Sequence, residues 1–153
     1  MASFDKRSVL VTGAASGIGR LLAQRFHAAG ATVIAWDVDA AGLDALVAEL
    51  GPGRVHAHRC DLQDRDDVRR QAARVLAQTG PVDVLVHNAG VVSGKFLLDA
   101  TEEDIERTLR INTLALFWTT RAFLPAMLER DRGTVVTVSS AAGLVGVAFV
   151  AGK

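Results

Sequence analysis

The sequence has one cysteine, few prolines and no surplus of either charge. Cys60 has no second cysteine to pair with, so an internal disulfide is excluded and nothing indicates an oxidising compartment. The 17 basic and 17 acidic residues cancel, which argues against nucleic acid or an anionic membrane as a partner. No apolar run reaches the roughly 18 residues of a membrane span, and no signal peptide is evident. We therefore expect a cytoplasmic protein without a membrane segment.

Short apolar runs alternate along the chain with stretches of helical period, over a length that suits one domain, residues 1–153. We expect strands at residues 8–12, 32–36, 55–60, 82–86 and 133–139. Helices are expected between them, at about 18–29, 39–50, 64–78 and 101–130, the last of them bent at Pro125. This alternation is typical of an α/β fold, in which crossover helices cover a parallel sheet.

Three glycines, Gly13, Gly17 and Gly19, lie between the first buried strand and an amphipathic helix. A pyrophosphate needs backbone N–H donors and the positive end of a helix dipole, and glycines let the backbone approach that closely. No Gly-Lys-Ser/Thr follows, so the loop is not a P-loop. A flexible strand-to-helix turn is the plainer interpretation of the same glycines.

Asp37 favours the nucleotide interpretation, because it lies 18 residues after Gly19 at the end of the second strand. An acid at that place can bind both ribose hydroxyls of an adenosine half. The same carboxylate would repel a 2′-phosphate, so we expect NAD in preference to NADP. The alternative is that Asp37 is a solvated acid or caps a helix, and Asp39 is the better candidate for the cap.

Further motifs follow in order: Thr12-Gly13-Ala14-Ala15-Ser16-Gly17-Ile18-Gly19, Asp61-Leu62, Asn88-Ala89-Gly90, Asn112 and Ser139-Ser140. Together they resemble the short-chain dehydrogenase/reductase family. Residues 117–127, with Trp36-Asp37, look most like its branch of retinol dehydrogenases and 17β-hydroxysteroid dehydrogenases. The resemblance implies a Rossmann-type doubly wound parallel sheet, here truncated after the fifth strand, and usually a homo-oligomer.

The resemblance also implies a role for each motif. The cofactor would be bound by Gly13, Ser16, Gly17, Ile18, Gly19, Asp37, Asp61, Leu62, Asn88, Ala89 and Gly90. Ser140 would hydrogen-bond the substrate oxygen, and the backbone carbonyl of Asn112 would hold a water of the proton relay. His87 replaces the usual first Asn of its segment, a departure expected to affect the strand more than the chemistry. The implied reaction is hydride transfer between a nicotinamide and a lipophilic secondary or allylic alcohol or its carbonyl.

The family's proton donor is the tyrosine of a Tyr-x-x-x-Lys motif, but this chain has no tyrosine. Its usual place after the serine falls on Lys153, and the phenylalanine four residues before that lysine has no proton to transfer. We therefore expect no turnover from this chain alone. A non-catalytic NAD-binding module and a non-functional truncated gene product are the alternatives. We also expect the apolar side chains of Leu114, Phe117, Leu124 and Leu128 to be exposed.

His56, His58 and Cys60 alternate along the third strand, so their side chains share one face at a spacing compatible with metal ligands. No fourth ligand is indicated nearby. We expect a half-buried or solvent-facing surface there and no metal.

Overall fold

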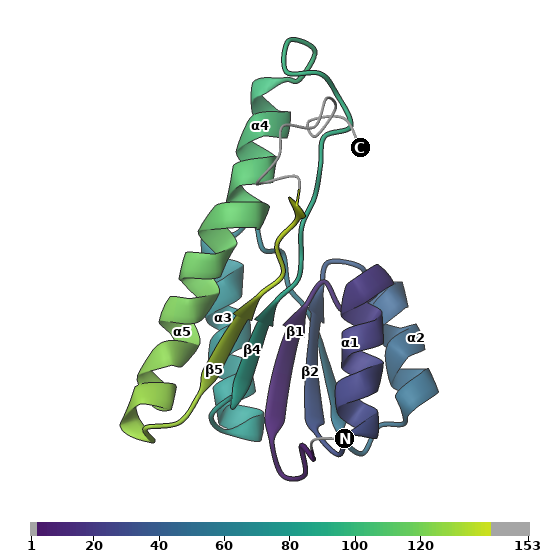
Figure 1. Ribbon diagram of the computed structural model, residues 1–153, viewed down its shortest axis with the longest axis vertical. Helices are drawn as coiled ribbons and strands as arrows, with labels where there is room; N and C mark the ends of the chain where they lie inside the picture. The colour runs from purple at the N-terminus through teal and green to yellow at the C-terminus, as the bar shows by residue number, and fades with distance from the viewer. Residues whose placement is uncertain (1–2, 142–153) are drawn as a thin grey trace.

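The computed structural model describes residues 3–141, which form a parallel sheet with helices on both faces (Figure 1). Its strands are β1 (Ser8–Thr12), β2 (Thr32–Asp37), β3 (Val55–Arg59), β4 (Val84–His87) and β5 (Thr134–Thr137). They lie in the spatial order β3-β2-β1-β4-β5, and every pairing is parallel. The chain thus runs outwards from β1 to β3 and then returns to the other side of β1. This order confirms the expected Rossmann-type doubly wound sheet.

The helices are α1 (Gly17–Ala28), α2 (Ala40–Leu50), α3 (Arg65–Thr79), α4 (Glu102–Leu109) and α5 (Ala115–Glu129). A π-helical segment, η1 (Arg110–Leu114), joins α4 to α5, so that the three form one long helix (Figure 1). Each of three helices starts at a residue whose side chain accepts a backbone N–H: Asp39 for α2, Asp64 for α3 and Thr101 for α4. Thr101 and Asp104 form a capping box, in which each side chain accepts the backbone N–H of the other residue.

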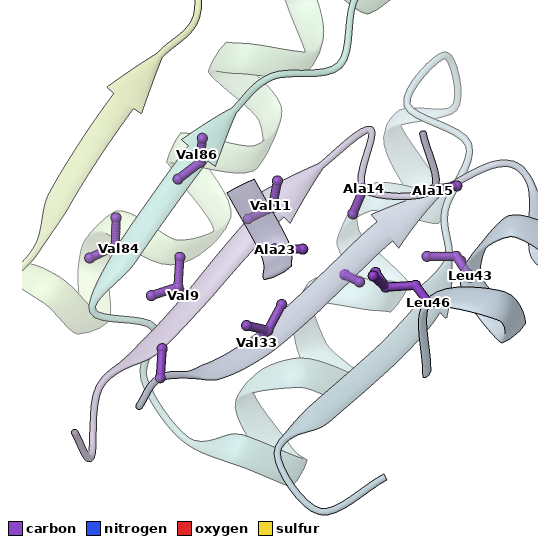
Figure 2. Close-up of a cluster of buried hydrophobic side chains, with 12 residues drawn as sticks. Val9, Val11, Ala14, Ala15, Ala23, Val33, Leu43, Leu46, Val84 and Val86 are labelled. Carbon is purple, nitrogen blue, oxygen red and sulfur yellow. The ribbon is translucent and has the colours of Figure 1, made fainter. Parts of the chain in front are cut away.

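Alternate residues of the strands face opposite helices, as the period of two in a strand requires. Figure 2 shows one side, where valines of β1, β2 and β4 lie against α1 and α2: Val9, Val11, Val33, Val84 and Val86 with Ala23, Leu43 and Leu46. On the other side Leu10, Ile34, Trp36 and Leu85 pack with α3 and α5. There the ring centroids of Trp36 and Phe123 are 5.7 Å apart. The three central strands β1, β2 and β4 are largely buried on both faces, as in other parallel sheets.

Three details differ from the sequence expectations. The fourth strand starts and ends later than expected, so His87 lies inside the sheet rather than after it. The expected helix at 101–130 contains η1, which the apolar pattern did not predict. His58 and Cys60 are buried, not solvent-facing, because α3 covers their side of β3.

The apolar residues expected to be exposed are exposed: Leu114, Phe117, Leu124 and Leu128. All of β5 is exposed as well. Between residues 3 and 141, no helix combines the length and apolar character needed to cross a bilayer.

Candidate functional site

The main candidate site is a cavity of about 410 Å³ at the carboxyl ends of the strands. It lies where β1 and β4 are neighbours, which is the point at which the strand order reverses, and open parallel sheets bind ligands at such a crevice. From the expected set it is lined by Gly13, Ser16, Gly17, Ile18, Asp37, Asp61, Leu62, Asn88, Ala89 and Gly90. It is also lined by Val38, Cys60, Gln63, Val91, Arg107 and Ile111, which were not expected.

The glycine loop forms the floor of this cavity by backbone-to-backbone packing. Gly13 and Gly17 have φ angles of 68° and 52°, in the left-handed region that favours glycine. Gly19 does not line the cavity but lies buried beneath it, where a Cβ would collide with the carbonyl oxygen of Gly13. A Cβ on Gly13 would lie 2.9 Å from the Cα of Ala89. The glycines therefore bring the loop, the first turn of α1 and the end of β4 closer together than side chains would allow.

Asp37 ends β2 and directs its carboxylate to the glycine loop. Its Oδ2 accepts the N–H of Ala15 at 3.0 Å, and its Oδ1 accepts the N–H of Asp39 at 3.0 Å. Asp39, not Asp37, caps α2 by accepting the N–H of Gly42, so the interpretation of Asp37 as a helix cap is wrong. Each carboxylate oxygen keeps a lone pair for a further donor, and the carboxylate lines the cavity in a fixed orientation.

Asn88 ties the end of β4 to the end of β1. Its side-chain amide donates to the carbonyl of Thr12 at 3.0 Å. In return, the hydroxyl oxygen of Thr12 accepts the N–H groups of Asn88 and Ala89, both at 3.1 Å. The side chain of Asn88 therefore positions the glycine loop, while Ala89 and Gly90 continue the wall of the cavity.

Asp61 follows β3 and is fixed by two contacts. Its N–H donates to Oδ2 of Asp67 at 2.8 Å, and its own Oδ1 accepts the N–H of Gln63 at 2.9 Å. Its Oδ2 has no hydrogen-bond partner among the residues that the structure describes, which leaves an acceptor for a ligand amine. Beside it, Cys60 is buried, and burial raises the pKa of its thiol, so it is not a thiolate nucleophile.

Asn112 lies in η1 next to Ile111, and it is not among the described residues that line the cavity. Its Oδ1 accepts the N–H of Val91, and its Nδ2 donates to the carbonyl of Val91, both at 2.8 Å. The sequence indicated a role for the backbone carbonyl of Asn112 and missed this two-point contact of its side chain. A π-helical turn inside an α-helix frequently marks a functional site, and here it presents this amide to the cavity wall.

His87 anchors the other end of the same segment to α5. Its Nδ1 lies 3.2 Å from the hydroxyl of Thr119 and its Nε2 3.0 Å from the hydroxyl of Thr120. The Thr119 hydroxyl donates its proton to the carbonyl of Ala115 at 2.6 Å, so Nδ1 of His87 carries the proton and Nε2 accepts from Thr120. Burial lowers the pKa of His87 to about 4, and the ring is neutral at pH 7.

Ser140 lies beyond the end of β5 and is exposed. It is not among the described residues that line the cavity. The structure therefore brings the expected cofactor residues together but does not place Ser140 beside them. In residues 3–141 no three His, Cys, Asp or Glu side chains are grouped as a metal site would require, those of β3 included.

Comparisons with known proteins agree with this geometry. A sequence model of the family described as short chain dehydrogenase matches residues 7–152. Epidermal retinol dehydrogenase 2 of Homo sapiens is 44% identical over 142 residues, which are 91% of this chain and 46% of that protein. Estradiol 17-beta-dehydrogenase 11 of Homo sapiens is 44% identical over 144 residues, 93% of this chain and 48% of that protein. The chain thus spans about half the length of the curated relatives it matches.

Solved structures show the same likeness. A short-chain dehydrogenase from Streptomyces avermitilis is 40% identical with a TM-score of 0.88, over 95% of this chain and 53% of that one. A metagenomic short-chain oxidoreductase, solved in complex with NADP, is 35% identical with a TM-score of 0.90, over 96% of this chain and 68% of that one. The resemblance to the family and to its retinol and 17β-hydroxysteroid dehydrogenase branch is confirmed. This chain belongs to the short-chain dehydrogenase family.

Proposed function

We propose that this chain is the dinucleotide-binding half of an NAD(P)-dependent oxidoreductase that acts on a CH–OH group. The observation that carries the proposal is the cavity at the switch point of the sheet, where the glycine loop, Asp37, Asp61 and the segment 88–90 meet. A nicotinamide bound there would give or accept the hydride. The residues fit such a group, because a Cβ at Gly13 or Gly19 would close the cradle that a pyrophosphate needs.

The chain's own residues would bind the dinucleotide in three places. The free N–H groups at the start of α1, around Ser16 and Ile18, donate to the pyrophosphate at the positive end of the helix dipole. Asp37 accepts from the hydroxyls of the adenosine ribose. The unpaired Oδ2 of Asp61 accepts from the adenine amine, and Leu62 packs beside the ring.

We propose NAD as the preferred cofactor because a carboxylate at the end of β2 that binds the ribose hydroxyls would repel a 2′-phosphate. The charge-neutral variant Asp37→Asn keeps the shape of the side chain and removes the repulsion. In the unmodified chain NADH should bind about tenfold more tightly than NADPH or better, and in Asp37→Asn the two dissociation constants should approach one another.

Isothermal titration calorimetry with NADH and NADPH tests both parts of the proposal. Asp44→Asn is the matched control, an exposed acid on α2 that does not line the cavity. Absence of NADH binding would refute the dinucleotide site. A preference for NADH that survives in Asp37→Asn would refute only the explanation of cofactor choice.

For catalysis we propose that Ser140 hydrogen-bonds the substrate oxygen and that the carbonyl of Asn112 holds a water of the proton path. The chain contains no tyrosine, so the phenolic proton donor of the family is not among its residues. We therefore propose that this chain alone binds cofactor without turnover and so behaves as a binding module. Cofactor-dependent oxidation of retinol, estradiol or a simple secondary alcohol by the purified chain would refute this.

The substrate class and the location belong to the whole protein. The names of the relatives support a lipophilic secondary or allylic alcohol, or the corresponding ketone, as the substrate. We propose a cytoplasmic location and a homo-oligomer. Fractionation of cells and sedimentation of the purified protein test these two statements.

A further inference from the structure

Arg107 is the one positively charged side chain among the described residues that line the cavity. It lies on α4, one helical turn before Ile111, which lines the same cavity. Glu103 and Asp104 lie within one turn of Arg107, yet within residues 3–141 its guanidinium makes no ion pair or hydrogen bond. Asp104 is paired instead with Lys95, at 2.6 Å. The charge of Arg107 is therefore available to a ligand.

The cavity needs a positive charge if its ligand is a dinucleotide. Asp37 and Asp61 already place two carboxylates in its lining, and a pyrophosphate adds two further negative charges. The start of α1 offsets only about half a charge. Without a cation, the binding of an anion in this cavity would be opposed by repulsion over short distances.

The other candidate for this role is Arg20, which follows the glycine loop directly. Its Nη2 pairs with Oε2 of Glu49 at 2.6 Å, and its Nη1 donates to the carbonyls of Ala15 and Gly42. It does not line the cavity. Arg20 therefore joins α1 to α2 and has no charge left for a ligand, whereas Arg107 has.

We propose that Arg107 is a specificity-determining contact for the phosphates of the bound dinucleotide, an inference that rests on the proposed function. Backbone N–H groups of the glycine loop would hold the pyrophosphate from the floor of the cavity, and the guanidinium would reach it from α4. A guanidinium suits this role because it donates several hydrogen bonds in one plane and stays charged at any working pH. α4, which lies beyond the carboxyl ends of the strands (Figure 1), would then bind cofactor directly.

The test compares Arg107→Gln with Arg107→Lys in the full chain, using calorimetric titration with NADH, ADP and adenosine. Arg110→Gln is the matched control, because Arg110 is exposed one turn further along, pairs with Glu106 and does not line the cavity. We expect Arg107→Gln to weaken the binding of NADH and ADP about tenfold and the binding of adenosine less than about twofold. The affinities of Arg107→Lys should lie between those of Arg107→Gln and the unmodified chain. The affinity of the unmodified chain for ADP should also fall more steeply with salt than that of Arg107→Gln.

The outcomes separate this inference from the proposed function. If the unmodified chain binds no NADH, the proposed function fails and the role of Arg107 fails with it. If it binds NADH and Arg107→Gln binds NADH and ADP equally well, only the role of Arg107 fails. If Arg107→Gln loses the same affinity for adenosine as for ADP, the role is also overturned, because a contact of Arg107 with the base, not with the phosphates, would then explain the loss. Circular dichroism of each variant confirms that the fold is retained.

Discussion

Replacing His87 by Asn should make the stability of the protein less sensitive to acid. In the folded chain the ring is buried between β4 and α5, with both nitrogens hydrogen-bonded to threonine hydroxyls. Burial lowers its pKa from 6.5 to about 4. Asn carries a donor and an acceptor for the same hydroxyls but does not titrate.

The sign follows from where the proton binds. Above pH 6.5 the ring is neutral in both the folded and the unfolded chain, so the folded state is not penalised. As pH falls from about 6.5 towards about 4, the unfolded chain takes up a proton that the folded chain rejects, and stability is lost at up to about 1.4 kcal/mol per pH unit. Over the whole interval the loss amounts to about 3 kcal/mol.

Urea unfolding between pH 7.5 and 4, followed by tryptophan fluorescence, to which the buried Trp36 contributes, measures this. The pKa values of His27 and His58 are also lowered, first of all by burial, but they titrate in both proteins and cancel in the difference. As the pH drops, we expect the free energy of unfolding of the unmodified chain to fall by about 3 kcal/mol relative to that of His87→Asn. If the free energy of unfolding depends on pH in the same way for the unmodified chain and for His87→Asn, a neutral, buried His87 is refuted.

Two further predictions concern residues that support the cavity from behind its lining. Gly19→Ala should destabilise the chain by at least about 2 kcal/mol and abolish NADH binding, because the new Cβ meets the carbonyl of Gly13. Gly53→Ala is its control, since no atom lies within 4 Å of that Cβ, and thermal unfolding should show little change. Asn112→Ala should weaken NADH binding severalfold in calorimetry and increase amide exchange at Val91, because both hydrogen bonds to that residue are lost. Unchanged exchange at Val91 would show that the side chain of Asn112 does not hold this segment.

The sheet could be predicted from the sequence because local and tertiary preferences agree along β1, β2 and β3. β1 and β2 are short apolar runs followed by a turn or cap residue, and β3 alternates apolar and polar residues as a half-buried strand does. The residues of the cavity could be predicted because they lie at the ends of these strands. Asp37 is the last residue of its strand, and the carboxyl ends of neighbouring parallel strands must meet.

The parts that could not be predicted depend on contacts between distant segments. The π-helical turn has no local signal, because Asn112 is fixed by Val91, 21 residues away. The burial of His87 depends on Thr119 and Thr120 of another element, so a polar side chain ends up inside the sheet. Arg107 was missed because a lone arginine on a polar helix is ordinarily solvated, and only the fold shows that its turn faces the cavity.

The long helix from α4 to α5 contacts the cavity and the core along one line of positions, four residues apart. Arg107 and Ile111 line the cavity, and the later positions of the same series, Ala115, Phe123 and Met127, are buried against the sheet. A regular helix would turn such a series gradually away from its partner, since four residues exceed one turn of 3.6. The wider turn of η1 corrects part of that drift. Deleting one residue from η1 would rotate the cavity positions by about 100° relative to the core positions. The length of this segment therefore keeps ligand contacts and core packing in phase, and its residue count is constrained even where its side chains are not.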